Sequence, residues 1–285
     1  MNTRKAVFAG SWYPASAADC EKEIRYFLNE AKPVSKRNFV GGIVPHAGWY
    51  FSGSIACNVI HMLSAEESPD VVAIFGMHLR PGSVCHIMAE GAWETPFGEL
   101  EIEEGIAGEL TQKFQFNIET PQHFTQDNTI ELQLPFIKYF FKDVKILPLG
   151  LPPDEKSLEI AKAVVEIAAR RGVRIKVIGS TDLTHYGMNY GFTPKGSGGT
   201  APVDWVRKEN DKKVIDAMLA MDASEVIREA LKNHNACCAG AAAGAIAAAK
   251  QLGAEKAEMT AYASSYDKHP GDSFVGYTGI VFNLD

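Results

Sequence analysis

The sequence predicts an α/β protein with three layers: a mostly parallel central sheet with helices on both faces. Apolar strand patterns alternate with amphipathic helix patterns through most of the 285 residues, which is typical of parallel strands joined by crossover helices. Several strands are nearly continuous apolar runs, as expected where both faces of a sheet are covered. The chain shows no internal repeat and no linker composition, so we expect one domain over residues 1–285.

The first half of the chain contains the patterns of two helices, three strands and a hairpin. Ser16 is suited to cap the first helix, and Pro96-Phe97-Gly98 is suited to the hairpin turn. Apolar residues spaced three and four apart mark the helices, and short apolar runs mark the strands. In order, we expect a helix over 17–30, a strand over 39–44, a helix over 54–63, strands over 71–75 and 84–89, and a hairpin over 91–100.

The second half continues the alternation and ends with helices and two strands. Pro135 favours a helix whose first turn lies near Leu134, because proline is tolerated there but not in a helix interior. Residues 187–200 are rich in glycine and form a loop long enough to act as a lid. We expect helices over 130–141, 155–170, 203–221, 224–231 and 239–252, and strands over 144–149, 174–179, 259–264 and 275–282.

Composition narrows the functional classes. There are 28 basic and 35 acidic residues, so the formal charge of 28 − 35 = −7 disfavours nucleic-acid and anionic-membrane partners. No apolar run approaches the roughly 20 residues of a membrane helix, and no secretory segment begins the chain. Five cysteines are an odd number and include no CxxC pair, which fits a reduced, cytoplasmic setting.

Three apolar strands run directly into polar residues able to bind a metal. His46 follows the strand over 39–44, His78 follows 71–75, and Asp182 with His185 follows 174–179. Ligands of α/β proteins bind beyond the carboxyl ends of the strands, so these side chains are expected to share a pocket. Asp182 and His185 suit a general acid–base pair. For each residue alone, a helix cap, a turn or a satisfied polar strand end remains an alternative.

Cys237 and Cys238 open an alanine-rich helix. The positive end of a helix lowers the pKa of a thiol, and the thiolate is both a nucleophile and a soft metal ligand. The alternative is that both cysteines are small residues packed under the helix. The chain has no GxSxG elbow, Walker loop or GxGxxG fingerprint, which removes the commonest hydrolase, NTPase and dinucleotide signals.

Short motifs from residue 4 to about residue 280 together resemble the Memo family, whose prokaryotic members are called AmmeMemoRadiSam system protein B. The motifs are Ala9-Gly10-Ser11-Trp12-Tyr13, Pro45-His46-Ala47-Gly48 with Ser52-Gly53, Ile130-Glu131 with Leu134-Pro135, Ser180-Thr181-Asp182 with His185, and Cys238 followed by Gly240.

The resemblance implies a fold like that of the LigB-like class III extradiol dioxygenases, which hold non-haem iron. By position, it assigns His46, His78 and Cys238 as metal ligands and Asp182 and His185 as further pocket residues. We expect Trp12, Tyr13 and Glu131 to bind substrate, although Glu131 also suits a helix-dipole partner. A radical-SAM protein of the same system is the implied partner.

Two departures from these relatives bear on the reaction. Cys238 stands where the dioxygenases use a carboxylate ligand, which puts ring cleavage in doubt. Asn128 stands where many relatives carry a histidine, so one proton shuttle is missing.

The leading hypothesis is a metal-dependent redox enzyme or oxygenase of unknown substrate. Two histidines and a cysteine suit one ion of copper or Fe(II) and would also accept zinc. In this hypothesis His185 is the acid/base and Asp182 orients it. The first alternative is a peptide- or phosphopeptide-binding module built on a dioxygenase-like fold. The second is a hydrolase with Cys238 as nucleophile and His185 as base.

Overall fold

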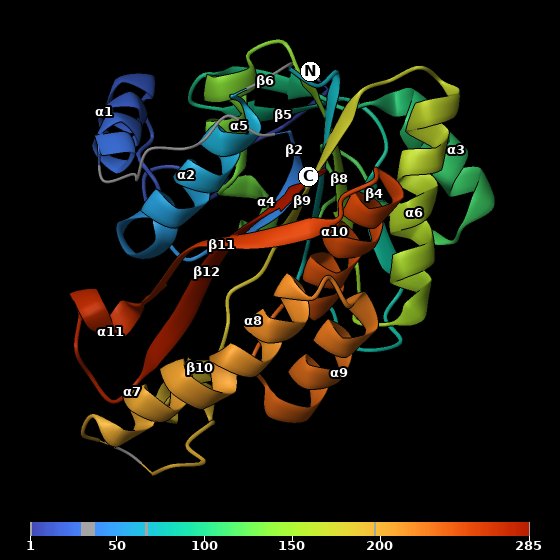
Figure 1. The fold of residues 1–285 in the computed structure, drawn as a ribbon. Helices are drawn as coiled ribbons and strands as arrows, with labels where there is room; N and C mark the ends of the chain where they lie inside the picture. The colour runs from blue at the N-terminus through green and yellow to red at the C-terminus, as the bar shows by residue number, and fades with distance from the viewer. Residues whose placement is uncertain (1, 30–37, 66–67, 197, 285) are drawn as a thin grey trace.

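The computed structural model describes residues 2–29, 38–65, 68–196 and 198–284 and is built around a curled nine-stranded sheet (Figure 1). The strands lie in the order β10-β12-β2-β9-β3-β8-β4-β7, and β11 also pairs with β12. Their bounds are β2 Phe39–Val44, β3 Val71–Gly76, β4 Cys85–Met88, β7 Phe116–Glu119, β8 Lys145–Gly150, β9 Ile175–Ser180, β10 His185–Tyr186, β11 Lys256–Ser264 and β12 Phe274–Asn283. A smaller sheet joins β1 (Thr3–Arg4), β5 (Ala92–Thr95) and β6 (Gly98–Glu101).

The centre of the large sheet is parallel. Strands β2, β9, β3 and β8 run in the same direction, with Val44 opposite Ser180 and Phe75 opposite Gly179. The neighbouring strands β12 and β4 pair with this block in the antiparallel sense, so the complete sheet is mixed. The predicted α/β class is confirmed, and the register brings the carboxyl ends of β2, β9 and β3 to one edge.

Helices cover both faces of the sheet and complete three layers. Alternate sheet residues belong to two separate apolar cores, as the side-chain period of a strand requires. One core includes α1 (Ala17–Asn29), α2 (Ser54–Leu63) and α5 (Leu134–Phe141). The other includes α3 (Glu104–Lys113), α6 (Glu155–Arg170), α8 (Asp211–Leu219), α9 (Ala223–Asn233) and α10 (Ala239–Gln251). The shorter helical segments are η1 Trp49–Gly53, α4 Asn128–Glu131, η2 Met188–Tyr190, α7 Ala201–Trp205, η3 Val206–Asn210 and α11 Ser265–Lys268.

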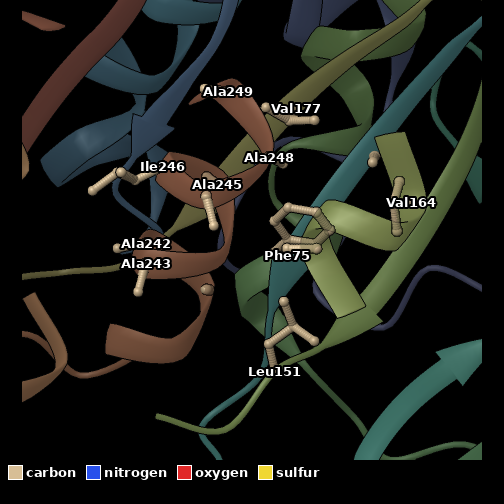
Figure 2. Close-up of a cluster of buried hydrophobic side chains, with 14 of the residues drawn as sticks. Phe75, Leu151, Val164, Val177, Ala242, Ala243, Ala245, Ile246, Ala248 and Ala249 are labelled. Atoms are coloured by element: carbon tan, nitrogen blue, oxygen red, sulfur yellow. The ribbon is translucent and has the colours of Figure 1, made fainter. Parts of the chain in front are cut away.

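Helix α10 approaches the sheet closely at glycines and alanines. Its alanines pack on Phe75 and Val177 (Figure 2). A Cβ on Gly179 of β9 would lie 2.7 Å from the Ala241 carbonyl oxygen, and one on Gly240 would lie 2.3 Å from the Leu151 carbonyl oxygen. This close approach holds the beginning of α10 at the sheet edge where β2, β9 and β3 end.

Most predicted elements match the observed ones, and the main differences concern three elements. The predicted helix over 203–221 is divided into α7, the π-helical segment η3 and α8. Helix α3 and strand β7 were not predicted. Glu30, the last residue of the first predicted helix, lies outside the described residues. Within the part of the chain that the structure describes, no helix has the length and apolarity needed to cross a membrane.

Candidate metal centre

Four metal-binding side chains converge at the carboxyl edge of the parallel strands. One donor atom from each of His46, His78, Cys237 and Cys238 lies within 4.8 Å of the others. His46 follows β2, His78 follows β3, and the cysteines immediately precede α10. The two imidazole rings meet edge to face with their centroids 5.0 Å apart. The strand-end histidines and the helix-end cysteines of the sequence therefore meet in space.

The hydrogen bonds of His46 leave its Nε2 facing the cysteines. Ser180 Oγ donates to the Thr129 carbonyl oxygen at 2.7 Å, so it accepts from His46 Nδ1, which lies 3.0 Å away. Nε2 lies 3.2 Å from Cys237 Sγ. The backbone N–H of His46 donates to Asp182 Oδ1 at 2.7 Å. A second partner that fixes ring orientation and tautomer in this way is typical of metal-binding histidines.

A left-handed backbone residue directs His78 toward the same point. Met77 has a φ of 71°, a conformation that costs a residue with a side chain on the order of 1–3 kcal/mol. Its N–H is held by Thr129 Oγ1 at 2.8 Å. Such strain at the end of a buried strand is concentrated at functional sites. The strained turn takes the chain out of β3 and places His78 beside His46.

The two cysteines are held through their backbones by the segment after β9. Cys237 N–H donates to the Asp182 carbonyl oxygen, and Cys238 N–H donates to Thr181 Oγ1, both at 3.1 Å. The two sulfur atoms lie 3.8 Å apart. Cys237 is partly exposed, whereas Cys238 is buried.

These surroundings give the two thiols opposite pKa shifts. Burial opposes ionisation of Cys237, but the Cys238 thiol and a cationic His46 overcome it and lower the pKa of Cys237 well below its usual range. Burial and the neighbouring Cys237 raise the pKa of Cys238. Burial also acts to lower the pKa of His46, yet Asp182 and Cys237 outweigh it and raise that pKa to about 9. These opposite shifts favour a thiolate on Cys237 beside a protonated His46.

Two residues of the centre, His46 and His78, line a cleft of about 560 Å³, which we call the aromatic cleft. This volume lies in the range of small-molecule sites. Aromatic residues supply much of the wall, and polar residues from several segments supply the rest. The residues that bear on the argument are Trp12, His46, Tyr50, His78, Asn128, Asp182, His185, Tyr190 and Tyr277.

Of the three residues predicted to bind substrate, the structure places only Trp12 at the cleft. Tyr13 and Glu131 are 4% and 0% exposed and do not line the cleft, which corrects that expectation. Glu131 Oε1 accepts from the backbone N–H groups of Val7 and Phe8 and from the Tyr13 hydroxyl. Both residues therefore anchor the N-terminal segment that carries Trp12.

Asp182 and His185 both reach the cleft but do not form the predicted pair. The Asp182 carboxylate accepts from the His46 N–H, and within the described residues no hydrogen bond joins it to the His185 ring. His185 instead meets Tyr190 edge to face, with ring centroids 5.0 Å apart. Burial raises the pKa of Asp182, against the opposing influence of His46. Asp182 therefore orients His46.

Sequence reasoning missed several residues that shape the centre. Ser180 and Thr129 hold His46 and Met77, and Tyr190 forms a wall of the cleft. Asn128 was noted only as a departure, yet its Nδ2 donates to the His46 carbonyl oxygen at 3.0 Å. Serine and threonine at the end of a buried strand were the available signal for Ser180, whereas Tyr190 lies in the short segment η2, which no sequence pattern marked.

The fold and the centre together define an α/β protein with a His-His-Cys-Cys cluster at the edge of its sheet. The chain belongs to the Memo family: the model for Memo-like proteins matches residues 4–281. Similar proteins include a MEMO1 family protein of Pyrococcus furiosus, 34% identical, and one of Methanopyrus kandleri, 32% identical. In both cases the similarity covers 98% of this chain and 98% of the relative.

A solved structure supports the fold alone. An uncharacterized protein from Escherichia coli K12 is similar over 85% of this chain and 98% of its own, with a TM-score of 0.53 and 9% sequence identity.

Proposed function

We propose that this protein binds one transition-metal ion at the centre and acts as a metal-dependent redox enzyme or oxygenase on a small molecule held in the aromatic cleft. The observation that carries the proposal is the convergence of four donor atoms within 4.8 Å, two of them from His46 and His78, which line that cleft. The expected relationship to the LigB-like dioxygenases supports the reaction class.

The donor set fits a metal ion. Two thiolate ligands at about 2.3 Å from a tetrahedral ion lie roughly 3.8 Å apart, and the cysteine sulfurs are separated by 3.8 Å. His46 Nε2 faces the cluster because Nδ1 is engaged by Ser180. His46, His78 and Cys237 would hold the ion, with Cys238 as an available fourth ligand. The sequence expectation named Cys238 as the third ligand, but the lowered pKa and partial exposure of Cys237 favour this neighbour.

The ligand types favour copper or iron, and they also accommodate zinc. Thiolate and imidazole are the softer protein ligands, which suit copper, zinc and iron better than magnesium or calcium. When bound, copper or iron would supply one-electron redox chemistry. His185 lines the cleft and is not one of the four cluster residues, so it is placed to exchange a proton with the ligand. Asp182 keeps His46 in place, and Trp12 and Tyr190 supply apolar walls.

The setting that we propose is the reducing cytoplasm, since all five cysteines are free. A radical-SAM protein of the same system is the proposed partner, on the strength of the family.

The test is turnover by metal-loaded protein. The chain is loaded with Fe(II) or copper, and oxygen uptake is followed with a panel of small phenols, thiols and carboxylates. We expect uptake with at least one compound and a decrease of roughly 10²–10⁴-fold in His185→Gln, which retains its metal. A loaded protein that consumes oxygen with no compound at a rate above that of the free ion would contradict the redox assignment.

One observation favours a second candidate, a thiol-dependent hydrolase. Cys237 Sγ lies 3.2 Å from His46 Nε2, a separation typical of a nucleophile and its base. The expected pair of Cys238 and His185 is not the one the geometry supports, because the Cys238 thiol is buried with a raised pKa. Hydrolysis of activated esters by metal-free protein, abolished in Cys237→Ser and suppressed by added Zn²⁺, would favour this candidate.

A further inference from the structure

A second cleft reaches the metal centre beside Cys237. It has a volume of about 610 Å³ and shares only His185 and Tyr190 with the aromatic cleft. The chain that follows His78 crosses between the two clefts, so Leu79 and Arg80 line the second one. Cys237 is part of its lining. We call it the arginine cleft.

None of the described residues that line the arginine cleft is acidic, in a chain whose formal charge is −7. Arg80 is exposed, and no described residue forms an ion pair or side-chain hydrogen bond with its guanidinium. The remaining ionisable groups of the lining are those of His185, Tyr190, His234 and Cys237. The aromatic cleft, in contrast, contains the carboxylate of Asp182. The permanent charge in the arginine cleft is therefore positive and unpaired.

Apolar side chains stand next to this charge. Phe192 and Leu231 line the arginine cleft, and Leu231 is 47% exposed, so its side chain is open to a ligand. Phe192 meets the His234 ring edge to face at 5.5 Å between centroids. A ligand that matches both parts of the cleft has an anionic head and an apolar body.

We propose that the arginine cleft binds a small organic carboxylate, with its carboxylate on Arg80 and its aromatic or aliphatic body against Phe192 and Leu231. An arginine presents a planar pair of N–H donors that matches the two oxygens of a carboxylate. A cleft of this volume accommodates a molecule of that size. The proposal rests on the proposed function in one respect: the carboxylate would lie beside the centre on the Cys237 side, in addition to the molecule held in the aromatic cleft.

Binding of phenylacetate to the metal-free full-length chain tests the charge requirement. We expect phenylacetate to bind more tightly than the neutral phenylacetamide, and more tightly than acetate, which lacks the apolar body. Arg80→Gln should weaken phenylacetate binding by about tenfold or more, as expected for loss of a charge-assisted hydrogen bond. The matched control is Arg228→Gln, which removes the same charge from α9 but does not line the cleft. Equal binding of phenylacetate by Arg80→Gln and the unmodified chain would overturn the proposal.

Alkylation of Cys237 gives a second readout that does not depend on metal or on turnover. Iodoacetate carries a carboxylate and iodoacetamide does not, so the ratio of their rates at Cys237 reports guidance of an anion. We expect this ratio to fall in Arg80→Gln while the iodoacetamide rate stays constant, and to be unchanged in Arg228→Gln. Peptide mapping identifies the labelled cysteine. A ratio that does not respond to Arg80 would also overturn the proposal.

Failure of this inference can be told apart from failure of the proposed function by measuring metal content in the same proteins. Arg80→Gln should bind metal like the unmodified chain. If phenylacetate binding depends on Arg80 but the chain takes up no metal, the proposed redox function is contradicted and the carboxylate site in the arginine cleft is supported. If metal content is normal but phenylacetate binding does not depend on Arg80, the metal centre is supported and the carboxylate site in the arginine cleft is rejected.

Discussion

The protonation of His46 should make metal binding depend on pH. Its pKa is raised to about 9 in the metal-free chain, because Asp182 and Cys237 outweigh the effect of burial. A metal must displace the proton on Nε2, whereas the lowered pKa of Cys237 favours the thiolate that binds the metal. The apparent affinity for Zn²⁺ should therefore rise about tenfold for each pH unit between roughly 6.5 and 9, as measured by competition with a chelator. Asp182→Asn should flatten this dependence.

The same shift has a consequence for stability. A histidine whose pKa is higher in the folded chain than in the unfolded chain stabilises the fold below about pH 6.5, and this contribution is lost as the pH rises through about 9. For the metal-binding prediction, a Zn²⁺ affinity that stays constant above pH 7 would show that His46 is neutral before the metal binds.

The cysteines should differ in reactivity. Cys237 is partly exposed with a lowered pKa, whereas Cys238 is buried with a raised pKa. Iodoacetamide should thus label Cys237 first in metal-free protein, and saturating Zn²⁺ should suppress the reaction. Peptide mapping after brief labelling measures both sites in one sample. Preferential labelling of Cys238 would instead support Cys238 as the metal ligand, as the sequence indicated.

Strand-end patterns predicted the histidines of the centre but could not choose between the adjacent cysteines. His46, His78 and Asp182 each follow an apolar run, and parallel strands bring such residues to one edge. Both cysteines precede the same helix, so their sequence signal is identical. Their difference arises from contacts distant in sequence: Asp182 holds the backbone of Cys237, and Thr181 holds that of Cys238.

At the scale of elements, the approach of α10 to the sheet should be sensitive to one methyl group. A Cβ on Gly240 would lie 2.3 Å from the carbonyl oxygens of Leu151 and Pro152, which are backbone atoms and cannot rotate away. Gly240→Ala should reduce the free energy of unfolding by roughly 1–3 kcal/mol, as overpacking commonly does. It should also weaken metal binding, because the cysteines move with the start of α10.

Gly108→Ala is the matched control in a helix without such a contact. Gly108 lies in α3, and a Cβ there would meet nothing within 4 Å. The substitution should stabilise the protein by roughly 0.5–1 kcal/mol, since glycine is a poor helix former. Urea unfolding of both variants measures the contrast. Equal effects of the two substitutions would contradict the packing described for α10.

Sequence patterns predicted the regular elements best. The predicted bounds of α2 and α6 are the observed ones, because apolar residues recur along one face of each. Helix α3 was missed because Gly105 and Gly108 weaken its pattern. The helix predicted over 203–221 contains the π-helical segment η3, since hydrophobic periodicity does not report a single wider turn.

For the molecule as a whole, a buried carboxylate should make stability fall as pH rises. Asp211 is buried where α8 meets the segment after β9, and it accepts from Thr184 and from the Tyr262 hydroxyl. Burial is the largest influence and raises the pKa of Asp211 to about 6. A carboxyl with a raised pKa stabilises the folded chain below about pH 4, and this contribution is lost as the pH rises through about 6.

Asp211→Asn isolates this contribution. Relative to the variant, the unmodified chain should lose about 3 kcal/mol of unfolding free energy between pH 4 and pH 7, which corresponds to roughly two pK units. Urea unfolding at a series of pH values gives the difference between the two curves. Parallel curves would show that Asp211 titrates normally.

The whole-molecule architecture was predictable in outline, because strand–helix alternation implies parallel strands. The antiparallel pairing of β12 with β2 and of β4 with β8 was not predictable, because the sequence of a strand does not indicate which neighbour it will have. The consequence for the centre is small, because β2, β3 and β9, which carry the polar ends, belong to the parallel block.

The measurement that tests the central claim most directly is the metal content of the protein and its variants, purified without chelator or metal-bearing tag and then offered Fe(II), copper or zinc in turn. The account predicts about one ion per chain with at least one of these metals. Metal content should fall sharply in His46→Ala, His78→Ala and Cys237→Ser. It should stay complete in the control His61→Gln, because His61 lies on α2 outside the cluster. Full occupancy in all three cluster variants would contradict it.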